Sequence, residues 1–461
     1  MLHRSPRILY TYKEFIFYFL PLSFSSPDYM RVIFHTFLFL IIITTASLSE
    51  IKVSCAQNIE KTESFAFKAP STFGSGDANV NPFAYRGEPL SFHSFLLFPN
   101  LTLEQAYNDN VLGTENNEKS DFVTVIKPEI IIAKDIGRHE FTARFASEIR
   151  RHFDVEDENV ENYNAELKGN IEIKRGLDIP LEISYRNGHL NRIDQRRASV
   201  NELTVKPLKN KALELESGII FKPNRLILSL LGNYREGRLE NEELFNGTTL
   251  NRDNRNVNIQ RAKAQIAYEY RNGFTPFAEV TFAHEDYINE ASDAVSRNND
   301  LLRILGGTSF DYKGLVTGFL GIGYEQRNFD DALVKDTNAL SLDGSITWEP
   351  TAKTKFLFDI ARQTFEDNLI VAGLTETTAG IEIRHEFKKD LFGRMHLSYE
   401  LDDFEDIARE DETYDSEFEL LYIIGPHLQL GAGYNYITRE SSAAGLGLDN
   451  SIVFIRARAA L

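Results

Sequence analysis

The chain has 461 residues, of which 42% are apolar and 26% charged, so its composition is that of a folded protein rather than a disordered one. Its net charge of −18 at pH 7 argues against non-specific binding to nucleic acid. The single cysteine, Cys55, lies in a segment that we expect to be removed, which excludes disulfides and cysteine–metal sites in the mature chain.

The N-terminal region predicts export. Arg31 supplies a positive start, residues 32–46 are mostly apolar, and small residues resembling a cleavage site follow. We therefore expect a signal peptide over residues 30–56, which sends the chain through the secretory pathway, and a start-site extension over residues 1–29. The alternative is a permanent membrane anchor, but its apolar core is shorter than the roughly 18–20 residues that a spanning helix needs.

Residues 57–94 are rich in Ser, Gly, Asn and Pro and show no sustained period, so we expect a flexible periplasmic leader there. Residues 1–56 carry five basic and three acidic side chains, and their removal changes the net charge from −18 to −20. This acidic balance does not argue against a membrane location, because alternation along strands sets the lipid-facing surface.

From Phe95 to Leu461 the chain divides into segments with apolar residues at every second position, which is the signature of β-strands. Two kinds of connection alternate between them. Short turns rich in Gly, Pro, Asn and Asp occur at 135–137, 175–178, 223–224, 271–274, 312–314, 349–352, 388–390 and 425–426. Long polar loops occur at 108–119, 152–159, 191–207, 237–255, 288–298, 328–336, 367–373, 404–412 and 438–449.

This arrangement predicts an all-β fold: a transmembrane antiparallel up-and-down β-barrel of about 18 strands over residues 95–461, of the outer-membrane type. An even number of strands places both barrel ends on the short-turn side, which would be the periplasm. A soluble β-sandwich also alternates. The strand lengths, the mixed charges on the polar face and the aromatic residues near segment ends favour the membrane.

The first strand also carries a resemblance to a known family. Its opening stretch "FPNLTLEQAYNDNV" resembles the start of a family of outer-membrane β-barrel porins associated with exopolysaccharide export, through Pro99, Leu101, Leu103, Tyr107, Asp109, Asn110 and Val111. The resemblance implies a channel through which a polysaccharide leaves the cell, with possible partners for export in the periplasm. The chain departs from the wider outer-membrane pattern at its last residue, Leu461, where an aromatic residue is usual.

Charged residues on the polar face are the candidates for function. Judged by their positions in the alternation of apolar and polar residues, the candidates that line the lumen are Arg144, Glu148, Arg150, Glu182, Arg186, Lys263, Glu382, Arg384, Arg394, Glu400, Arg456 and Arg458. Rings of charge select solutes by sign and by hydrogen bonding, and Arg144, Arg150, Arg456 and Arg458 could form a basic patch across the closing seam. The alternative is a set of salt bridges across the lumen in which these side chains only satisfy one another.

No sequence motif indicates catalysis, a metal or a cofactor. His284 is predicted to face the lipid, but no serine that could pair with it is visible. The acidic run at 402–415 fits no calcium-loop pattern and is predicted to be a solvated loop, although its carboxylates could bind cations that bridge lipopolysaccharide.

The sequence thus predicts a channel in a Gram-negative outer membrane, for exopolysaccharide export or for saccharides and other polar solutes, rather than an enzyme. We expect outer-membrane lipids, lipopolysaccharide and a polar or polysaccharide solute as partners, and no nucleic acid. Two alternatives remain: an outer-membrane enzyme that modifies lipids, and a structural or adhesive barrel whose lumen is filled by side chains.

Overall fold

The computed structural model describes residues 87–193, 203–271, 273–288, 296–366, 373–405 and 407–460. The predicted start-site extension, the signal peptide and residues 57–86 of the predicted leader lie outside these ranges. No helix among the described residues is long and apolar enough to cross a membrane.

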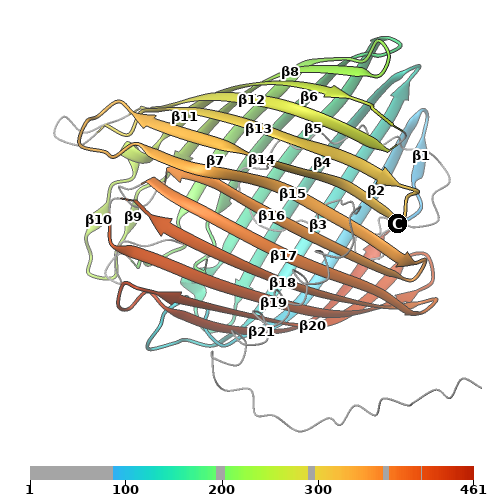
Figure 1. Cartoon of the computed structure of the whole chain (residues 1–461). Coiled ribbons are helices and arrows are strands. Elements are labelled where there is room, and N and C mark those ends of the chain that lie inside the picture. The colour runs from blue at the N-terminus through green and yellow to red at the C-terminus, as the bar shows by residue number, and fades with distance from the viewer. Residues whose placement is uncertain are drawn as a thin grey trace, which may run out of the picture. The chain divides into compact units, whose positions relative to one another are not determined.

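Eighteen long strands, β2–β8 and β11–β21, form one antiparallel sheet in which each strand pairs with the next along the chain (Figure 1). Their bounds are β2 Phe95–Asn108, β3 Asp121–Ile136, β4 His139–His152, β5 Val160–Lys174, β6 Leu177–His189, β7 Lys209–Phe221, β8 Leu226–Leu239, β11 Val257–Tyr268, β12 Phe274–Tyr287, β13 Asn299–Tyr312, β14 Val316–Phe329, β15 Thr337–Thr351, β16 Thr354–Glu366, β17 Gly373–Lys388, β18 Leu391–Phe404, β19 Arg409–Ile424, β20 Leu428–Ser441 and β21 Leu448–Ala460.

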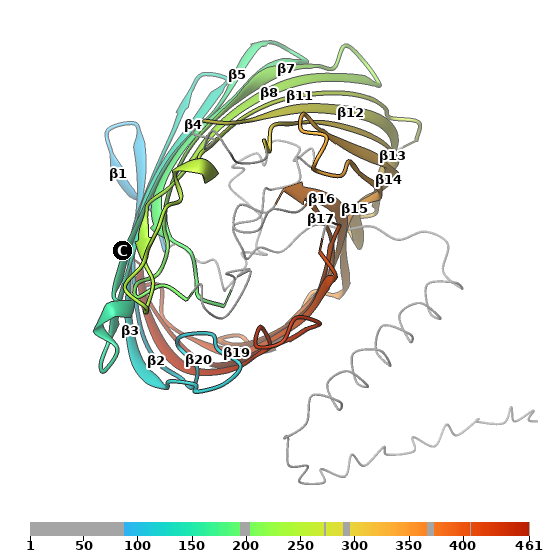
Figure 2. The ribbon, with the colours of Figure 1, turned by 90° about the vertical axis from the view of Figure 1, so that its left-hand side faces the viewer.

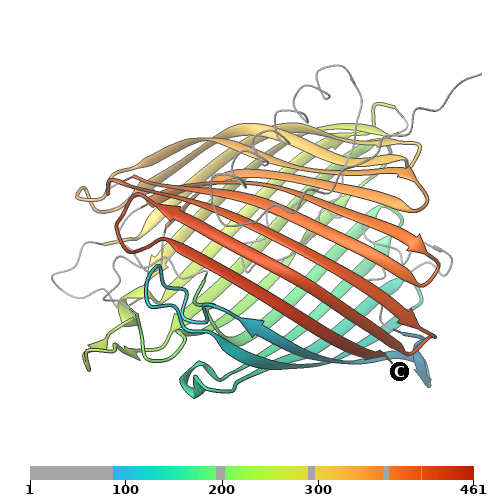
Figure 3. The ribbon, with the colours of Figure 1, turned by 90° about the horizontal axis from the view of Figure 1, so that it is seen from below.

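The sheet closes on itself because the first and last long strands pair. β2 and β21 are antiparallel from Asn100–Ala460 to Asn108–Ile452, with Glu104 opposite Arg456. Figure 2 shows the resulting ring from one end, and Figure 3 shows β21 beside the first strands of the barrel. The predicted closed barrel and its strand number are therefore confirmed.

The two ends of the barrel differ as the turn pattern predicts. Tight turns lie at one end, which we call the short-turn end, and join β3–β4, β5–β6, β7–β8, β11–β12, β13–β14, β15–β16, β17–β18 and β19–β20. Longer connections lie at the other, the long-loop end, where one carries the short strands β9 (Glu242–Glu243) and β10 (Thr249–Leu250) and the 3-10 turn Asp253–Arg255. A second 3-10 turn, Glu156–Glu158, lies between β4 and β5.

The barrel begins earlier than the sequence predicts. Leu90–Phe92 form β1, which pairs with Phe95–Leu97 at the start of β2 although we expected a leader without structure up to residue 94. Alternation cannot reveal a strand of three residues, so the prediction missed it. Gly87 packs against Ala460, which places both described ends of the barrel at the short-turn end.

The acidic run at 402–415 is not a solvated loop. Asp402 lies in β18, and Arg409 to Asp415 lie in β19, so the connection is confined to residues 405–408. Its polar residues lie on both faces of the barrel wall. On the interior, Asp402 lies opposite Asp411 in the strand register, and on the outside Glu412 accepts a hydrogen bond from Tyr414. Nine of these fourteen positions carry a charge, on both faces, which concealed the alternation.

Apolar side chains cover the outer face of the barrel. Ile322, Leu230 and Ile455 are all more than half exposed there, whereas Ser229 on β8, Thr281 on β12 and Glu325 on β14 are buried on the interior. Such a continuous apolar surface is far larger than the patches that soluble monomers expose. It fits hydrocarbon, in which a closed barrel pairs its backbone groups within the sheet.

Aromatic residues gather toward both ends of the outer wall, as expected for membrane interfaces. Toward the long-loop end, Tyr107 and Phe122 have ring centroids 5.2 Å apart. Toward the short-turn end, Trp348 stacks on Phe356 at 5.0 Å. The two belts border the apolar band and support its assignment to lipid.

A charge placed on this band should destabilise the barrel only where lipid covers it. Ile455 in the middle of β21 is 62% exposed, and Leu333 in the β14–β15 loop is 81% exposed. We expect Ile455→Arg to lower the free energy of unfolding in phospholipid vesicles by about 2–4 kcal/mol. Leu333→Arg should change it little. Urea titration of tryptophan fluorescence measures both, and equal effects would contradict the membrane assignment.

Candidate functional site

The twelve charged residues that the sequence analysis selected all lie on the interior face by strand register, opposite the exposed apolar side chains. Arg144 alternates with the exposed Phe145, Arg186 with Tyr185, and Arg456 with Ile455. The structure groups most of them with carboxylates that the same alternation places beside them.

One chain of ion pairs crosses the closing seam of the barrel. Glu382 on β17 pairs with Arg384 and, at 3.5 Å, with Arg394 on β18. Arg394 pairs with Glu417 and, at 3.4 Å, with Glu419 on β19. This part of the wall therefore alternates in charge from strand to strand.

The chain of ion pairs continues past β20 to β2. Glu419 lies 3.2 Å from Arg456 on β21, and Arg456 lies 3.1 Å from Glu104 on β2. The intervening strand β20 has Gly431 at this level. A Cβ on Gly431 would lie 2.9 Å from Arg456 Cγ and 3.0 Å from Glu419 Oε1, so the missing side chain leaves the space through which the two residues meet.

The basic patch predicted at the seam is not formed as such. Arg144 lies 2.7 Å from Glu129, and Arg150 lies 2.7 Å from Glu148, which also contacts Lys127 at 2.9 Å. The other two arginines of the predicted patch also have partners, since Arg458 donates to Thr102 at 3.3 Å and Arg456 pairs as described above. Carboxylates in phase with these arginines, Glu148 on the same strand and Glu129 and Glu104 on neighbouring strands, neutralise the patch.

The remaining candidates lie farther round the wall. Glu182 contacts Lys168 at 3.1 Å, Lys263 contacts Glu279 at 3.2 Å, and Arg186 lies opposite Asn164 in register. Three further ion pairs were not predicted from the sequence: Arg303–Asp343 at 3.4 Å, Arg327–Glu285 at 2.9 Å and Lys168–Glu166 at 2.6 Å. The alternation that identified the others also applies to these residues.

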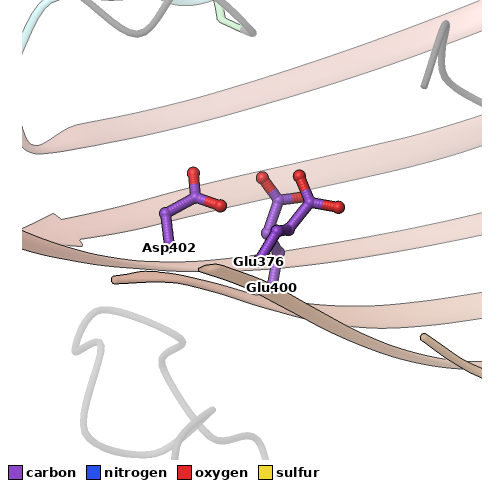
Figure 4. A group of neighbouring side chains, drawn as sticks. All are labelled: Glu376, Glu400 and Asp402. Carbon is purple, nitrogen blue, oxygen red and sulfur yellow. The ribbon is translucent and has the colours of Figure 1, made fainter. Parts of the chain in front are cut away.

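Glu400 belongs to a group of three carboxylates on β17 and β18 (Figure 4). One carboxylate oxygen of each of Glu376, Glu400 and Asp402 lies within 4.8 Å of the others. Glu376 and Asp402 face each other in register. This group was not predicted from the sequence, because the run 402–415 reads as a solvated loop and Asp402 was placed in it.

At the long-loop end a buried ion pair joins two loops. Arg192 donates to Glu158 from Nε at 3.0 Å and from Nη2 at 2.6 Å, and its Nη1 donates to Thr204 Oγ1 at 2.8 Å. Burial raises the pKa of the Glu158 carboxyl, while its hydrogen bonds to Arg192 act in the opposite direction. The pair ties the β6–β7 loop to the β4–β5 loop.

His284 lies on the outer face, as predicted, with Nδ1 2.9 Å from Asp300 Oδ1 on β13. Within the described part of the chain, no recorded hydrogen bond of His284 goes to a serine. The pair lies toward the long-loop end and contributes polar groups to the edge of the apolar band.

Taken together, the interior offers closely spaced carboxylates, guanidinium groups and hydroxyls that exchange hydrogen bonds along the wall. Paired charges of this kind can hydrogen-bond polar groups. The arrangement suits passage of hydrated molecules.

The space at Gly431 makes the seam network testable. Gly431→Leu places a side chain between Glu419 and Arg456, and we expect it to lower the free energy of unfolding by about 1–3 kcal/mol through overpacking. Gly306→Leu is the matched control, because a Cβ on Gly306 meets nothing within 4 Å. Urea titration in vesicles compares the two, and an equal effect would contradict the role assigned to Gly431.

Solved structures similar to this chain include outer-membrane proteins. Among solved structures, the outer membrane protein opdK from Pseudomonas aeruginosa has a TM-score of 0.41 at 11% identity, covering 79% of this chain and 98% of that one. OpdO from the same organism has a TM-score of 0.43 at 12% identity, covering 79% and 97%. The copper transporter OprC has a TM-score of 0.44 at 8% identity, covering 81% and 82%.

No curated protein matches the sequence. A family model described as "Putative beta-barrel porin 2" matches residues 83–461, which are most of the chain and include every strand of the barrel. The chain therefore belongs to this family of outer-membrane β-barrel porins.

Proposed function

We propose that this protein is a channel in a Gram-negative outer membrane through which hydrated polar solutes pass. The observation that carries the proposal is the closed ring of eighteen strands, apolar outside and charged inside. Barrels of this size enclose more space than side chains alone fill, and porins with 16–18 strands leave an aqueous channel. In this proposal the twelve selected residues line that channel.

Saccharides are the proposed class of solute, and export of an exopolysaccharide is the specific role. The support is the resemblance at Pro99–Val111 together with the chemistry of the wall, since carboxylates and guanidinium groups exchange hydrogen bonds with sugar hydroxyls. Transport of this kind needs no catalytic group. Partners in the periplasm would supply the driving force.

The same proposal includes the route and the surroundings of the barrel. The signal peptide proposed for residues 30–56 takes the chain through the secretory pathway. Outer-membrane lipids contact the apolar band, and lipopolysaccharide contacts its polar edge near His284 and Asp300. The short-turn end faces the periplasm, as in other outer-membrane barrels.

The proposal predicts stepwise current from the purified protein in planar bilayers. Arg394→Gln with Arg456→Gln removes two positive charges from the wall while Glu382, Glu417 and Glu419 remain. We expect the reversal potential in a KCl gradient to shift toward cation selectivity. The matched control is Arg151→Gln, whose side chain lies on the outer face and pairs with Glu161.

Two outcomes would count against the proposal. Absence of current from folded protein would remove the channel. If the protein conducts but deletion of its gene leaves the amount of secreted polysaccharide unchanged, the export role is contradicted and general solute passage remains.

A further inference from the structure

An apolar cluster lies on the interior at the long-loop end, where an open water-filled mouth would leave such residues exposed. Leu208, Leu374 and Phe404 form this cluster, which we call the mouth cluster, and each of them is at most 3% exposed. Leu190, Leu239 and Phe365 pack against it. Their burial at the mouth requires that the cluster's members cover one another.

The members come from opposite arcs of the ring. Leu208 directly precedes β7, whereas Leu374 lies in β17 and Phe404 in β18. In one direction round the barrel, seven strands (β8 and β11–β16) separate β7 from β17. In the other direction, seven strands (β2–β5 and β19–β21) separate β6 from β18. The contact therefore joins the two sides of the mouth.

On one side, the end of the β16–β17 hairpin leaves the wall and folds inward. Pairing between β15 and β16 stops at Leu342–Arg362, but pairing between β16 and β17 continues to Glu366–Gly373. Figure 2 shows the ends of these orange strands inside the outline of the ring. Leu374 is thereby carried toward the centre of the mouth.

Contacts with the strands underneath hold the folded end in place. Glu325 on β14 accepts a hydrogen bond from the Thr364 amide at 2.7 Å, and Arg327 donates to the Thr364 carbonyl at 3.1 Å. A Cβ on Gly373 would lie 2.8 Å from Thr337 Oγ1 on β15. The hairpin end therefore lies directly over β15 and is bonded to β14.

On the other side, contacts to two separate parts of the wall fix the described ends of the β6–β7 loop. The Leu190 amide donates to the Leu208 carbonyl at 2.8 Å. Arg192 is held by Glu158, and Arg439 on β20 donates to the Ile193 carbonyl at 3.1 Å. These bonds position Leu208 at the base of the loop, where it meets the opposite side.

We propose that the mouth cluster is a bridge across the long-loop end that limits the size of the solutes the channel admits. This inference rests on the proposed channel function. The bridge narrows the mouth with apolar side chains, and an apolar constriction opposes the passage of water and ions. The paired charges farther along the wall then act only on molecules small enough to pass the bridge, or on a chain that displaces it.

Charge substitution on both sides of the bridge tests the proposal. In Leu208→Asp with Leu374→Asp, two like charges replace the apolar contact, and we expect single-channel conductance to rise by about twofold as the bridge separates and becomes hydrated. Swelling of protein-containing liposomes should also show uptake of larger saccharides. Leu208→Lys with Leu374→Asp places opposite charges there and should return both measurements toward the wild-type values.

The matched control separates the bridge from local damage. Leu357 is buried on the interior face of β16 but lies outside the mouth cluster. Leu208→Lys with Leu357→Asp should therefore not return the conductance toward the wild-type value. The heat-dependent shift of the folded barrel in gel electrophoresis confirms that every variant compared is folded.

The outcomes distinguish failure of the bridge from failure of the proposed channel function. If the wild type conducts and every variant has the same conductance and the same solute size limit as the wild type, the bridge is contradicted but the channel function stands. A like-charged pair that behaves as the oppositely charged pair would also overturn it, because the effect would then not depend on contact across the mouth. Absence of current from the wild type and every variant would overturn the proposed function and the bridge with it.

Discussion

The need to pair every backbone amide and carbonyl within hydrocarbon is the constraint on which this structure depends. An unpaired group in lipid costs several kcal/mol, so a sheet that spans the membrane cannot have a free edge. The chain meets this requirement by bringing β2 back to β21, across more than 340 residues of sequence. The same ladder places Glu104 opposite Arg456, so the closing strands also share an ion pair.

Closure leaves the interior as the place for charged groups, and their arrangement depends on the residues between them. Glu419 and Arg456 lie on strands that are not neighbours, and they meet because Gly431 separates them. Arg303 on β13 also reaches Asp343 on β15 across β14, which has glycines at positions 321 and 323 in this stretch. A glycine within a strand often marks such a close approach. Here the glycines allow charge pairing to continue where large side chains would interrupt it.

The sequence was sufficient for the parts of the fold that depend on local patterns. Alternation such as Leu228 and Leu230 against Ser229 identifies the strands and their faces, and turn residues give the number of strands. The three-residue β1 and the strands within residues 402–415 were missed, because one is too short to alternate and the others carry charge on both faces.

The partners of the interior charges follow from register, which one sequence does not supply. Phase alone placed Arg144 and Arg150 on the same face as Arg456 and Arg458 and suggested a basic patch. Glu148, two residues before Arg150 on β4, pairs with it, while register brings Glu129 on β3 to Arg144, and the two carboxylates neutralise the patch. The mouth cluster could not be found from pattern at all, because Leu208, Leu374 and Phe404 are apolar residues at strand ends that are far apart in sequence.

The inward fold of β16 and β17 depends in turn on a small surface beneath it. The interior face of β15 near the long-loop end consists of Thr337, Ala339 and Ser341, which are almost fully buried. Larger residues there would hold the hairpin end away from the wall, and Glu325 and Arg327 could not reach Thr364 across β15. The small interior residues of β15 therefore allow the ends of β16 and β17 to leave the wall and fold inward. In this way the interior face of β15 determines whether the apolar contact at the mouth can form.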